Sequence, residues 1–289
     1  MTPTVTVLIP AFDAGRFVGE MMDSVLSTVG PSVEILVIDD GSTDDTAAVL
    51  ASYDDRRIRV LHQDNRGLVA TLNRGLDEAR GEFVARLDAD DWMVRGRIEA
   101  QLAAMAADPR LVSVGTDYVL VFPDGTESAR IRMPATDAAC RERLSLASCH
   151  CGPSVLLRMA PIRRAGLYFD ESARHAEDYE MWTRLTEVGT LANLPVRGYR
   201  YRIHDDQVST VHSAAQRKVH LAVAERYARA RGHDPVPERK LEGLLWPEGP
   251  RATRTLRASR AALAVLRRQR GTESVRFVGR KVVEAAARR

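Results

Sequence analysis

The 289-residue sequence has few cysteines and no long apolar run. Its three cysteines, Cys140, Cys149 and Cys151, are too sparse and odd in number for a disulfide framework, which favours a reducing compartment. No run approaches the roughly 20 apolar residues that a membrane-spanning helix needs. Residues 1–10 lack the positively charged start and the cleavage site of a signal peptide, and read instead as a strand. We therefore expect a cytoplasmic protein without a membrane span.

Several catalytic motifs are also absent, and each absence removes support for a class of enzyme. There is no Gly-x-x-x-x-Gly-Lys-[Ser/Thr] loop and no Gly-x-Gly-x-x-Gly after a strand, which disfavours ATPases and NAD-dependent dehydrogenases. Gly-x-Ser-x-Gly and His-Glu-x-x-His, typical of serine hydrolases and zinc proteases, are missing too. Cys149-His150-Cys151 has no second ligand pair for structural zinc, so we expect its cysteines to be buried as small hydrophobic residues.

The charge is unevenly distributed along the chain. Hydrophobic residues make up 45% and charged residues 28%, an ordinary globular balance, and the net charge is only +3. Residues 251–289, however, contain twelve Arg or Lys and two Glu, a charge of +10, which leaves −7 for the first 250 residues. The protein is an acidic body followed by a basic C-terminal segment.

The first 110 residues alternate between short apolar runs and helical patterns. Val5–Pro10 and Glu34–Asp39 are rich in Val and Ile, as is typical of strands buried on both faces, and Ile58–His62 and Phe83–Asp88 are shorter runs of this kind. The helical patterns between them are Phe17–Ser27, Thr46–Ser52 and Leu68–Ala79. This alternation predicts an α/β fold with a mostly parallel, Rossmann-like central sheet and helices on both faces. Ligands of such sheets bind beyond the carboxyl ends of the strands.

Beyond residue 110 the pattern is less regular. The expected strands are Leu111–Gly115, Tyr118–Phe122, Thr126–Arg132, Ser154–Arg158, Leu191–Leu194 and Tyr199–Ile203. The expected helices are Asp137–Ala147 and Asp178–Val188, and from Ala214 onward the pattern is helical. We therefore predict a domain of residues 1–213, with halves of about 1–110 and 111–213, followed by a helical basic region, 214–289.

Acidic residues follow the second and fourth expected strands. Asp39 and Asp40 end one strand, and Asp88, Asp90 and Asp91 end the other. Asp88 and Asp90 share one face of an extended segment, so their oxygens can hold a hard divalent cation, Mn²⁺ or Mg²⁺. The alternative is a solvated turn in which Asp90 or Asp91 caps a helix, and Asp39-Asp40 equally suits a helix start. The coincidence of two acidic strand ends favours a nucleotide site.

Six segments together resemble the family 2 glycosyltransferases, which have the GT-A fold. Three lie in the first half: Val5–Asp13 (VTVLIPAFD), Glu34–Asp44 (EILVIDDGSTD) and Leu87–Asp91 (LDADD). Three more follow in the order and spacing of that family: Ser154–Arg158, Ala176–Trp182 and Tyr201–His204. The resemblance covers about residues 4–211. It implies metal-dependent, inverting transfer of a sugar from a nucleoside-diphosphate sugar to a hydroxyl acceptor, with 1–110 as the nucleotide-binding half and 111–213 as the acceptor and catalytic half.

The resemblance also implies roles for individual residues. The nucleotide-sugar donor, with UDP, dTDP or GDP, would be held by Pro10, Ala11, Phe12, Asp13, Asp40, Gly67, Asp88 and Ala89. The metal ion would be held by Asp88, Asp90 and His204, and the acceptor contacted by His150, Glu177 and Trp182. Asp178 would be the catalytic base, although it also suits a helix cap, and Trp182 also suits the core. The acceptor would be a sugar, a lipid-linked molecule or a small molecule, in the synthesis of cell-envelope polysaccharide, glycolipid or glycoconjugate.

The basic segment has its own possible partners. Arg251, Arg254, Arg257 and Arg260 recur every three residues, while the leucines of the same stretch share a helical face. Such a helix can bind an anionic membrane surface, which would place the protein peripherally on the inner face of the membrane. The alternative is a solvated helix packed on the domain or on a second subunit of a homo-oligomer. Nucleic acid is not expected, because aromatic residues to stack on bases are lacking.

Two other functions compete with glycosyl transfer. A sugar nucleotidyltransferase would need a Gly-rich phosphate loop with basic residues after the first strand, whereas Ala11–Arg16 is acidic and poor in glycine. An inactive GT-A scaffold at the membrane would have no need of Asp88, Asp90 and Asp178. Both alternatives are therefore less favoured than the transferase.

Overall fold

The computed structural model describes residues 3–207, 212–269 and 271–287. The first half forms a parallel sheet in the order β3-β2-β1-β4, as the alternating pattern predicts. Its strands are β1 (Val5–Ala11), β2 (Val33–Asp39), β3 (Ile58–His62) and β4 (Phe83–Arg86). The connecting helices are α1 (Val18–Leu26), α2 (Thr46–Ala51) and α3 (Leu68–Glu78). The carboxyl ends of β1, β2 and β4 therefore lie at one edge of the sheet.

The second half continues the same sheet with strands of mixed direction. The full order is β3-β2-β1-β4-β7-β6-β8-β5, in which β7 runs antiparallel to both of its neighbours, and β5 antiparallel to β8. The added strands are β5 (Trp92–Met93), β6 (Leu111–Val121), β7 (Leu156–Arg158) and β8 (Thr190–Arg202). The helices of this half are α4 (Arg97–Ala107), α5 (Asp137–Leu144), α6 (Met159–Arg164) and α7 (Glu177–Leu185), with short 3₁₀ turns at Gly152–Ser154 and Glu171–Ala173. The mostly parallel arrangement is thus confined to β1–β4 and to the pair β6–β8.

Five of the strands predicted beyond residue 110 differ in the structure: two pairs merge and one strand does not form. Leu111–Gly115 and Tyr118–Phe122 belong to one strand, β6, and the two segments expected between 191 and 203 form one strand, β8. The pair stays continuous because a shift in register takes up Pro195 and Val196, so that Thr116 pairs with Leu194 and Asp117 with Arg197. The segment expected as a strand over 126–132 forms only isolated bridges to β6, since its residues stay largely exposed and bury no face.

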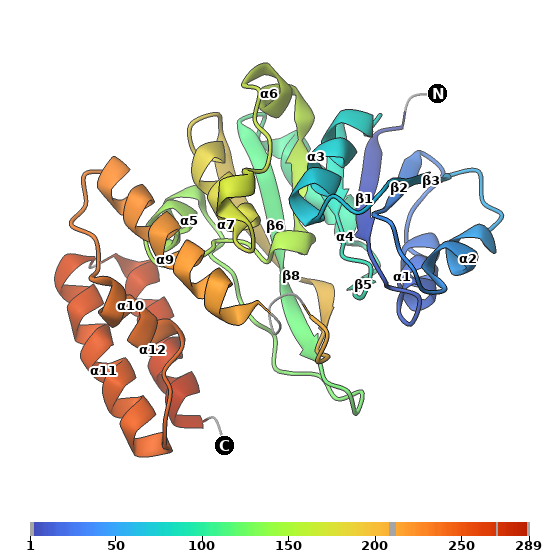
Figure 1. Cartoon of the computed structure of the whole chain (residues 1–289). Helices are drawn as coiled ribbons and strands as arrows, with labels where there is room; N and C mark the ends of the chain where they lie inside the picture. Colours follow the sequence, from blue (N-terminus) through green and yellow to red (C-terminus); the bar gives the residue numbers. More distant parts are fainter. Residues whose placement is uncertain (1–2, 208–211, 270, 288–289) are drawn as a thin grey trace.

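Helices cover both faces of the sheet. Alternate residues of β1 enter different cores: Leu8 belongs to the core that also includes residues of α3, α5, α7 and the C-terminal helices, whereas Val7 and Ile9 belong to the core with α1 and α4. The C-terminal helices are α9 (Ser213–Ala230), α10 (Glu238–Leu245), α11 (Arg251–Arg268) and α12 (Thr272–Ala287). Figure 1 shows them at the end of the molecule opposite β2 and β3, beside α5 and α7. The predicted helical C-terminal region is confirmed, and its apolar side chains join the core of the α3 face.

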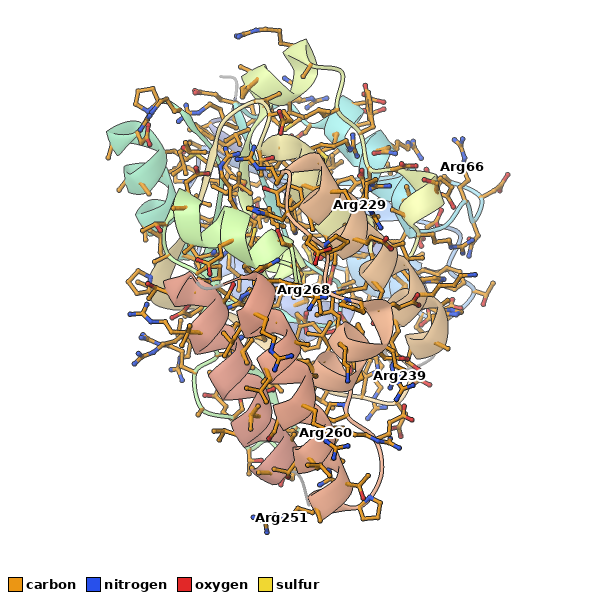
Figure 2. The ribbon with its side chains drawn as sticks, turned by 90° about the vertical axis from the view of Figure 1, so that its left-hand side faces the viewer. Arg66, Arg229, Arg239, Arg251, Arg260 and Arg268 are labelled. Atoms are coloured by element: carbon orange, nitrogen blue, oxygen red, sulfur yellow. The ribbon has the colours of Figure 1, made fainter. Side chains whose placement is uncertain are left out.

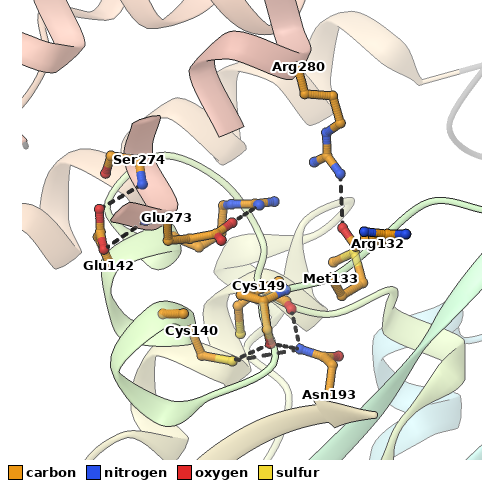
Figure 3. A network of polar contacts seen from close by, with 12 residues as sticks. Arg132, Met133, Cys140, Glu142, Cys149, Asn193, Glu273, Ser274 and Arg280 are labelled. Carbon is orange, nitrogen blue, oxygen red and sulfur yellow. Dashed lines mark hydrogen bonds and ion pairs between the residues drawn. The ribbon is translucent and has the colours of Figure 1, made fainter. Parts of the chain in front are cut away.

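Polar contacts fix α12 to α5. Glu142, in α5, accepts a hydrogen bond from the backbone N–H of Ser274 at 2.6 Å, and Arg143 forms a buried ion pair with Glu273. Arg280 donates to the carbonyl oxygen of Arg132 at 2.9 Å. Figure 3 shows these contacts above the buried Cys140 and Cys149. Among the described residues, no helix combines the length and apolarity needed to cross a membrane.

Candidate functional site

A cleft of about 600 Å³ opens at the carboxyl ends of β1, β2 and β4. One wall is formed by the segments that follow these strands and by the start of α3. The opposite wall comes from the segment before α7 and from the residues after β8. Of the predicted site residues, the cleft is lined by Pro10, Ala11, Phe12, Asp13, Asp40, Gly67, Asp88, Ala89, Asp90, Glu177 and His204. Residues that are more than 190 positions apart in the sequence thus share one cavity.

Asp40 holds the loop that leads into α3. Its Oδ1 accepts hydrogen bonds from the Gln63 side chain at 2.6 Å and from the backbone N–H of Arg66 at 2.9 Å, and its Oδ2 accepts from Gly67 N–H at 2.8 Å. Gly67 has a φ of +83°, a conformation that glycine adopts readily. Because a carboxylate has about four acceptor positions, Asp40 can still accept one bond from a ligand in the cleft.

Asp13 braces the rim of the same wall. Its Oδ1 accepts a hydrogen bond from Thr43 N–H at 2.8 Å, and its own N–H donates to Ser42 Oγ at 3.0 Å. These bonds tie the segment after β1 to the segment after β2. The neighbouring Phe12 side chain is 50% exposed and lines the cleft. The rim therefore combines an exposed aromatic face with a tethered carboxylate.

Three aspartates gather after β4, but only two of them face the cleft. Carboxylate oxygens of Asp88, Asp90 and Asp91 lie within 4.8 Å of one another. Asp91 is 1% exposed, and it accepts from Tyr199 Oη at 2.5 Å and from Arg202 N–H at 2.6 Å. Burial, with the nearby Asp90 and Asp88, raises the pKa of Asp91 well above its usual range. Asp91 thus braces β8 from inside, and Asp88 and Asp90 remain for a ligand.

His204 completes this group from the far wall. Its Nε2 lies 2.9 Å from Asp90 Oδ2, and its ring packs against Phe17 at 4.6 Å between centroids. Its Nδ1 is buried, and no hydrogen-bond partner for it exists among the described residues. Two carboxylates and an imidazole nitrogen suit Mn²⁺ or Mg²⁺, whose other positions are filled by water or by phosphate oxygens. The residues present therefore fit a divalent metal ion.

Neither Asp90 nor Asp91 caps a helix. The next helix, α4, begins at Arg97 and its N-cap residue is Gly96. The alternative in which Asp90 or Asp91 serves only as a helix cap is therefore wrong. The hydrogen bonds of both residues instead lead to β8 and to His204.

Asp178 and Glu177 open α7 on the opposite wall. The N-cap residue of α7 is Ala176, so Asp178 lies inside the first turn and is not the cap. Its Oδ1 accepts from Tyr179 N–H at 2.6 Å. Its Oδ2 lies so close to Gly152 that a Cβ there would clash with it and with Arg86. Glu177 is buried and lines the cleft, and the partly exposed Asp178 lies beside it, close to Gly152.

Arg86, the last residue of β4, was not among the predicted site residues. It is 5% exposed, and its Nη2 donates to Asp88 Oδ1 at 3.0 Å. The charges of Asp88 and Asp178 raise the pKa of its guanidinium, against the opposing effect of burial. The one cation of Arg86 therefore interacts with the charges of both Asp88 and Asp178. A signal exists in the sequence, because Arg86 is the one charged residue inside the run Phe83–Leu87.

The carboxylates of this cleft titrate above their usual range. Burial and the charge of the adjacent Asp178 together raise the pKa of Glu177 to about 7. Burial also raises the pKa of Asp88 to about 6, against the opposing effect of Arg86. For Asp178 burial again raises the pKa, and Arg86 opposes it. Glu177 thus takes up a proton near neutral pH.

We expect Glu177→Gln to flatten the pH dependence of stability. Because the folded pKa of Glu177 lies above its ordinary value, the folded protein binds a proton that the unfolded chain has released. The free energy of unfolding therefore falls as the pH rises from about 4.5 to 7. Between pH 5 and pH 8, the variant should lose about 2 kcal/mol less than the wild type. Urea denaturation of the metal-free protein at both pH values measures this difference. Glu238→Gln, at an exposed position, is the control, and equal losses in wild type and Glu177→Gln would contradict the prediction.

Two predicted acceptor residues lie in the core and not in the cleft. His150 is 3% exposed, with Nε2 2.8 Å from Ser113 Oγ and Nδ1 2.7 Å from Asn193 Oδ1. Trp182 is fully buried and packs edge-on against the His150 ring. Burial lowers the pKa of His150 to about 4. Both ring nitrogens of His150 have a hydrogen-bond partner, and Trp182 is enclosed by protein. Neither side chain reaches the cleft, so the prediction that they contact the acceptor is corrected.

The mouth of the cleft is formed by residues for which no role was predicted. Arg174, His175 and His212 line it, and the two imidazole rings stack with centroids 4.4 Å apart. His175 has a φ of +74°, which is unusual for a residue other than glycine. No motif could have identified this pair, since His175 and His212 come from separate segments that meet only in the folded chain.

The architecture and the acidic cleft define an α/β protein of the GT-A class. Over 98% of this chain and 89% of its own length, the UDP-GlcNAc complex of Staphylococcus aureus TarS 1–349 superimposes with a TM-score of 0.65 at 15% identity. The mannosyltransferase PcManGT of Pyrobaculum calidifontis, in complex with GDP-Man and Mn²⁺, covers 99% of this chain with a TM-score of 0.59 at 17% identity. That alignment covers 76% of the mannosyltransferase chain. The predicted GT-A fold is confirmed.

Residues 6–164 match the family model "Glycosyl transferase family 2", and the chain belongs to this family. The hyaluronan synthase of Pasteurella multocida is 29% identical over 235 residues, which are 80% of this chain and 24% of that protein. An uncharacterized glycosyltransferase of Haemophilus influenzae is 27% identical over 226 residues, 74% of this chain and 70% of that protein. The chain thus spans about a quarter of the hyaluronan synthase that it matches.

Proposed function

We propose that this protein transfers a sugar from a nucleoside-diphosphate sugar to a hydroxyl group of an acceptor, with a divalent metal ion and with inversion at the anomeric carbon. The observation that carries the proposal is the single cleft that holds three groups. These are the Asp40 loop, the pair Asp88 and Asp90 with His204, and Glu177 at the start of α7, next to Asp178. Family membership and solved relatives in complex with UDP-GlcNAc or GDP-Man support a donor of this class.

Different residues of the cleft are assigned to the nucleoside and to the diphosphate of the donor. We assign the nucleoside to the strand ends of the first half, where Asp40 has an acceptor position left for a base N–H and Phe12 presents an exposed ring. Asp88, Asp90 and His204 would hold Mn²⁺ or Mg²⁺, and the metal ion neutralises the charge of the departing diphosphate when bound. With such a leaving group, this chain has no need to supply a general acid.

The chain must supply a base for the acceptor hydroxyl, and we assign this role to Asp178. The hydroxyl would lose its proton to the Asp178 carboxylate as its oxygen attacks the anomeric carbon on the face opposite the diphosphate. One displacement of this kind inverts the configuration. Arg86 keeps a positive charge beside Asp178, which favours the ionised form that a base requires. Glu177, which lines the cleft next to Asp178, is assigned to the acceptor side.

The acceptor that we propose is a sugar chain. Curated relatives include proteins named hyaluronan synthase and chondroitin synthase, which supports a sugar hydroxyl as the acceptor in polysaccharide or glycoconjugate synthesis. The exposed mouth with Arg174, His175 and His212 would be the side from which the acceptor enters.

A thermal-shift panel tests the donor and the metal together. UDP, dTDP, GDP, CDP and ADP are each added with Mn²⁺, with Mg²⁺ or with EDTA. We expect one diphosphate to raise Tm by about 5 °C or more, and only with metal, because a ligand at about a hundred times its Kd adds roughly 2.7 kcal/mol to stability. Asp90→Ala should abolish the shift, whereas Asp45→Ala, at an exposed position outside the cleft, should retain it. If no nucleotide shifts Tm under any condition, the transferase proposal is wrong.

A further inference from the structure

The outer faces of α11 and α12 expose an unusual share of apolar side chains. Eight large hydrophobic side chains are exposed among the described residues, and four of them belong to these two helices. They are Leu256 (51% exposed), Leu263 (60%), Val275 (51%) and Val283 (67%). Exposed apolar side chains gathered on two neighbouring helices indicate a surface that binds something.

On α11 these residues form a stripe together with arginines. Leu256, Arg260, Leu263 and Arg267 follow one another at spacings of four, three and four, so they share one face of the helix. The opposite face is buried against the rest of the protein through Ala258, Ala261, Ala262 and Val265. The stripe therefore points away from the core.

On α12 the outward side has the same character. Val275, Arg276 and Val283 are exposed, and the opposite side is buried through Ser274, Phe277, Val278 and Ala285. The contacts of Glu142 and Arg143 with this helix fix the buried side against α5 (Figure 3). Neither helix can turn its exposed apolar residues inward, because its inner face is already occupied.

The arginines of these faces are free to bind a partner. Within the described part of the chain, the guanidinium groups of Arg260 and Arg267 on α11 and of Arg276 on α12 have no hydrogen-bond or ion-pair partner. Figure 2 shows Arg251 and Arg260 on the side of the molecule where α11 and α12 lie. Residues 251–289 carry a charge of +10. The missing partner is therefore anionic and also accommodates apolar side chains.

We infer that the outer faces of α11 and α12 dock on a membrane surface that contains anionic lipids. Leucine and valine side chains would enter the boundary of the acyl chains, while the arginines bind lipid phosphates. A nucleic acid fits less well, because Phe277 is the only aromatic residue of these helices and it is buried. A second copy of the chain fits less well too, because arginines interrupt the apolar residues, whereas the core of a protein interface is depleted of charge.

Vesicle co-sedimentation of the full chain tests this inference. We expect the protein to sediment with vesicles of phosphatidylcholine and phosphatidylglycerol but not with phosphatidylcholine alone, and less at 500 mM than at 50 mM NaCl, because salt screens the attraction. Arg260→Glu/Arg267→Glu should weaken binding at least tenfold, since each basic residue at an anionic surface contributes about fivefold. Leu256→Ser/Leu263→Ser should weaken binding at both salt concentrations, because the apolar contribution is not screened.

The control is Arg56→Glu/Arg164→Glu, which changes the net charge equally at exposed sites outside these helices, and binding should change less than twofold. The Tm of each variant without nucleotide shows that its fold is intact, so the outcome is independent of the proposed function. Equal binding to both kinds of vesicle would overturn the inference, as would equal loss in the control. Absence of vesicle binding would also overturn the inference, whether or not the protein self-associates or binds single-stranded DNA.

Discussion

Asp178→Asn is expected to lower the rate of sugar transfer by about a thousandfold and to leave donor binding unchanged. General-base catalysis contributes about 10²–10⁴ to a rate, and asparagine cannot accept the proton of the acceptor hydroxyl. The substitution keeps the size of the side chain and its acceptor for Tyr179 N–H, so α7 should remain in place. Single-turnover transfer with the donor identified by thermal shift measures the effect.

Glu177→Gln is the matched comparison, because it neutralises the adjacent carboxylate. If Asp178 is the base, Glu177→Gln should reduce the rate less than Asp178→Asn, and the rate of the wild type should fall as the pH drops through the raised pKa of Asp178. A greater loss in Glu177→Gln would transfer the role of base to Glu177. Unchanged transfer by Asp178→Asn would rule out Asp178.

Arg86→Met is expected to lower the free energy of unfolding by about 3–5 kcal/mol at pH 8. The substitution removes a buried cation and leaves Asp88 and Asp178 without the charge that offsets their burial. The loss should be smaller at pH 5, because Asp88, with a pKa raised to about 6, is then largely protonated. Urea denaturation in EDTA at both pH values measures the effect without any contribution from metal binding.

Two controls separate this effect from the loss of any arginine. Arg86→Lys keeps the charge and should lose less stability, although lysine cannot reproduce the geometry of the guanidinium group. Arg110→Met removes an exposed partner of Asp108 and should change stability by less than about 1 kcal/mol. Equal losses in Arg86→Met and Arg110→Met would show that Arg86 has no special place between the two carboxylates.

The parts of the site that could be predicted follow local rules. Carboxylates directly after apolar strands reach the edge of a parallel sheet whatever the rest of the chain does, so Asp40, Asp88 and Asp90 were expected in one cleft and lie there. Helix α7 was predicted from its periodicity. The position of Asp178 inside the first turn was not predicted, because the N-cap position depends on the conformation of Ala176.

The wrong expectations concern residues whose surroundings come from distant segments. His150 looked available for an acceptor, yet Ser113 and Asn193 enclose it from β6 and β8. Those strands were expected in pieces, because Pro195 and the residues around Asp117 interrupt the local alternation. Only the pairing of β6 with β8 along their whole length shows that each strand continues through these positions.

The sequence by itself determined the family, the alternating architecture, the acidic strand ends and the basic character of the last helices, because each depends on residue types at short spacing. The tertiary structure decided which of these charges are free to act. Asp91 is buried and accepts hydrogen bonds from Tyr199, 108 positions away, and from Arg202, and Arg86 is buried beside Asp88. The arginines, leucines and valines on the outer faces of α11 and α12, in contrast, stay exposed. Burial and hydrogen-bond saturation are set by contacts between remote segments, and short patterns of residues do not encode them.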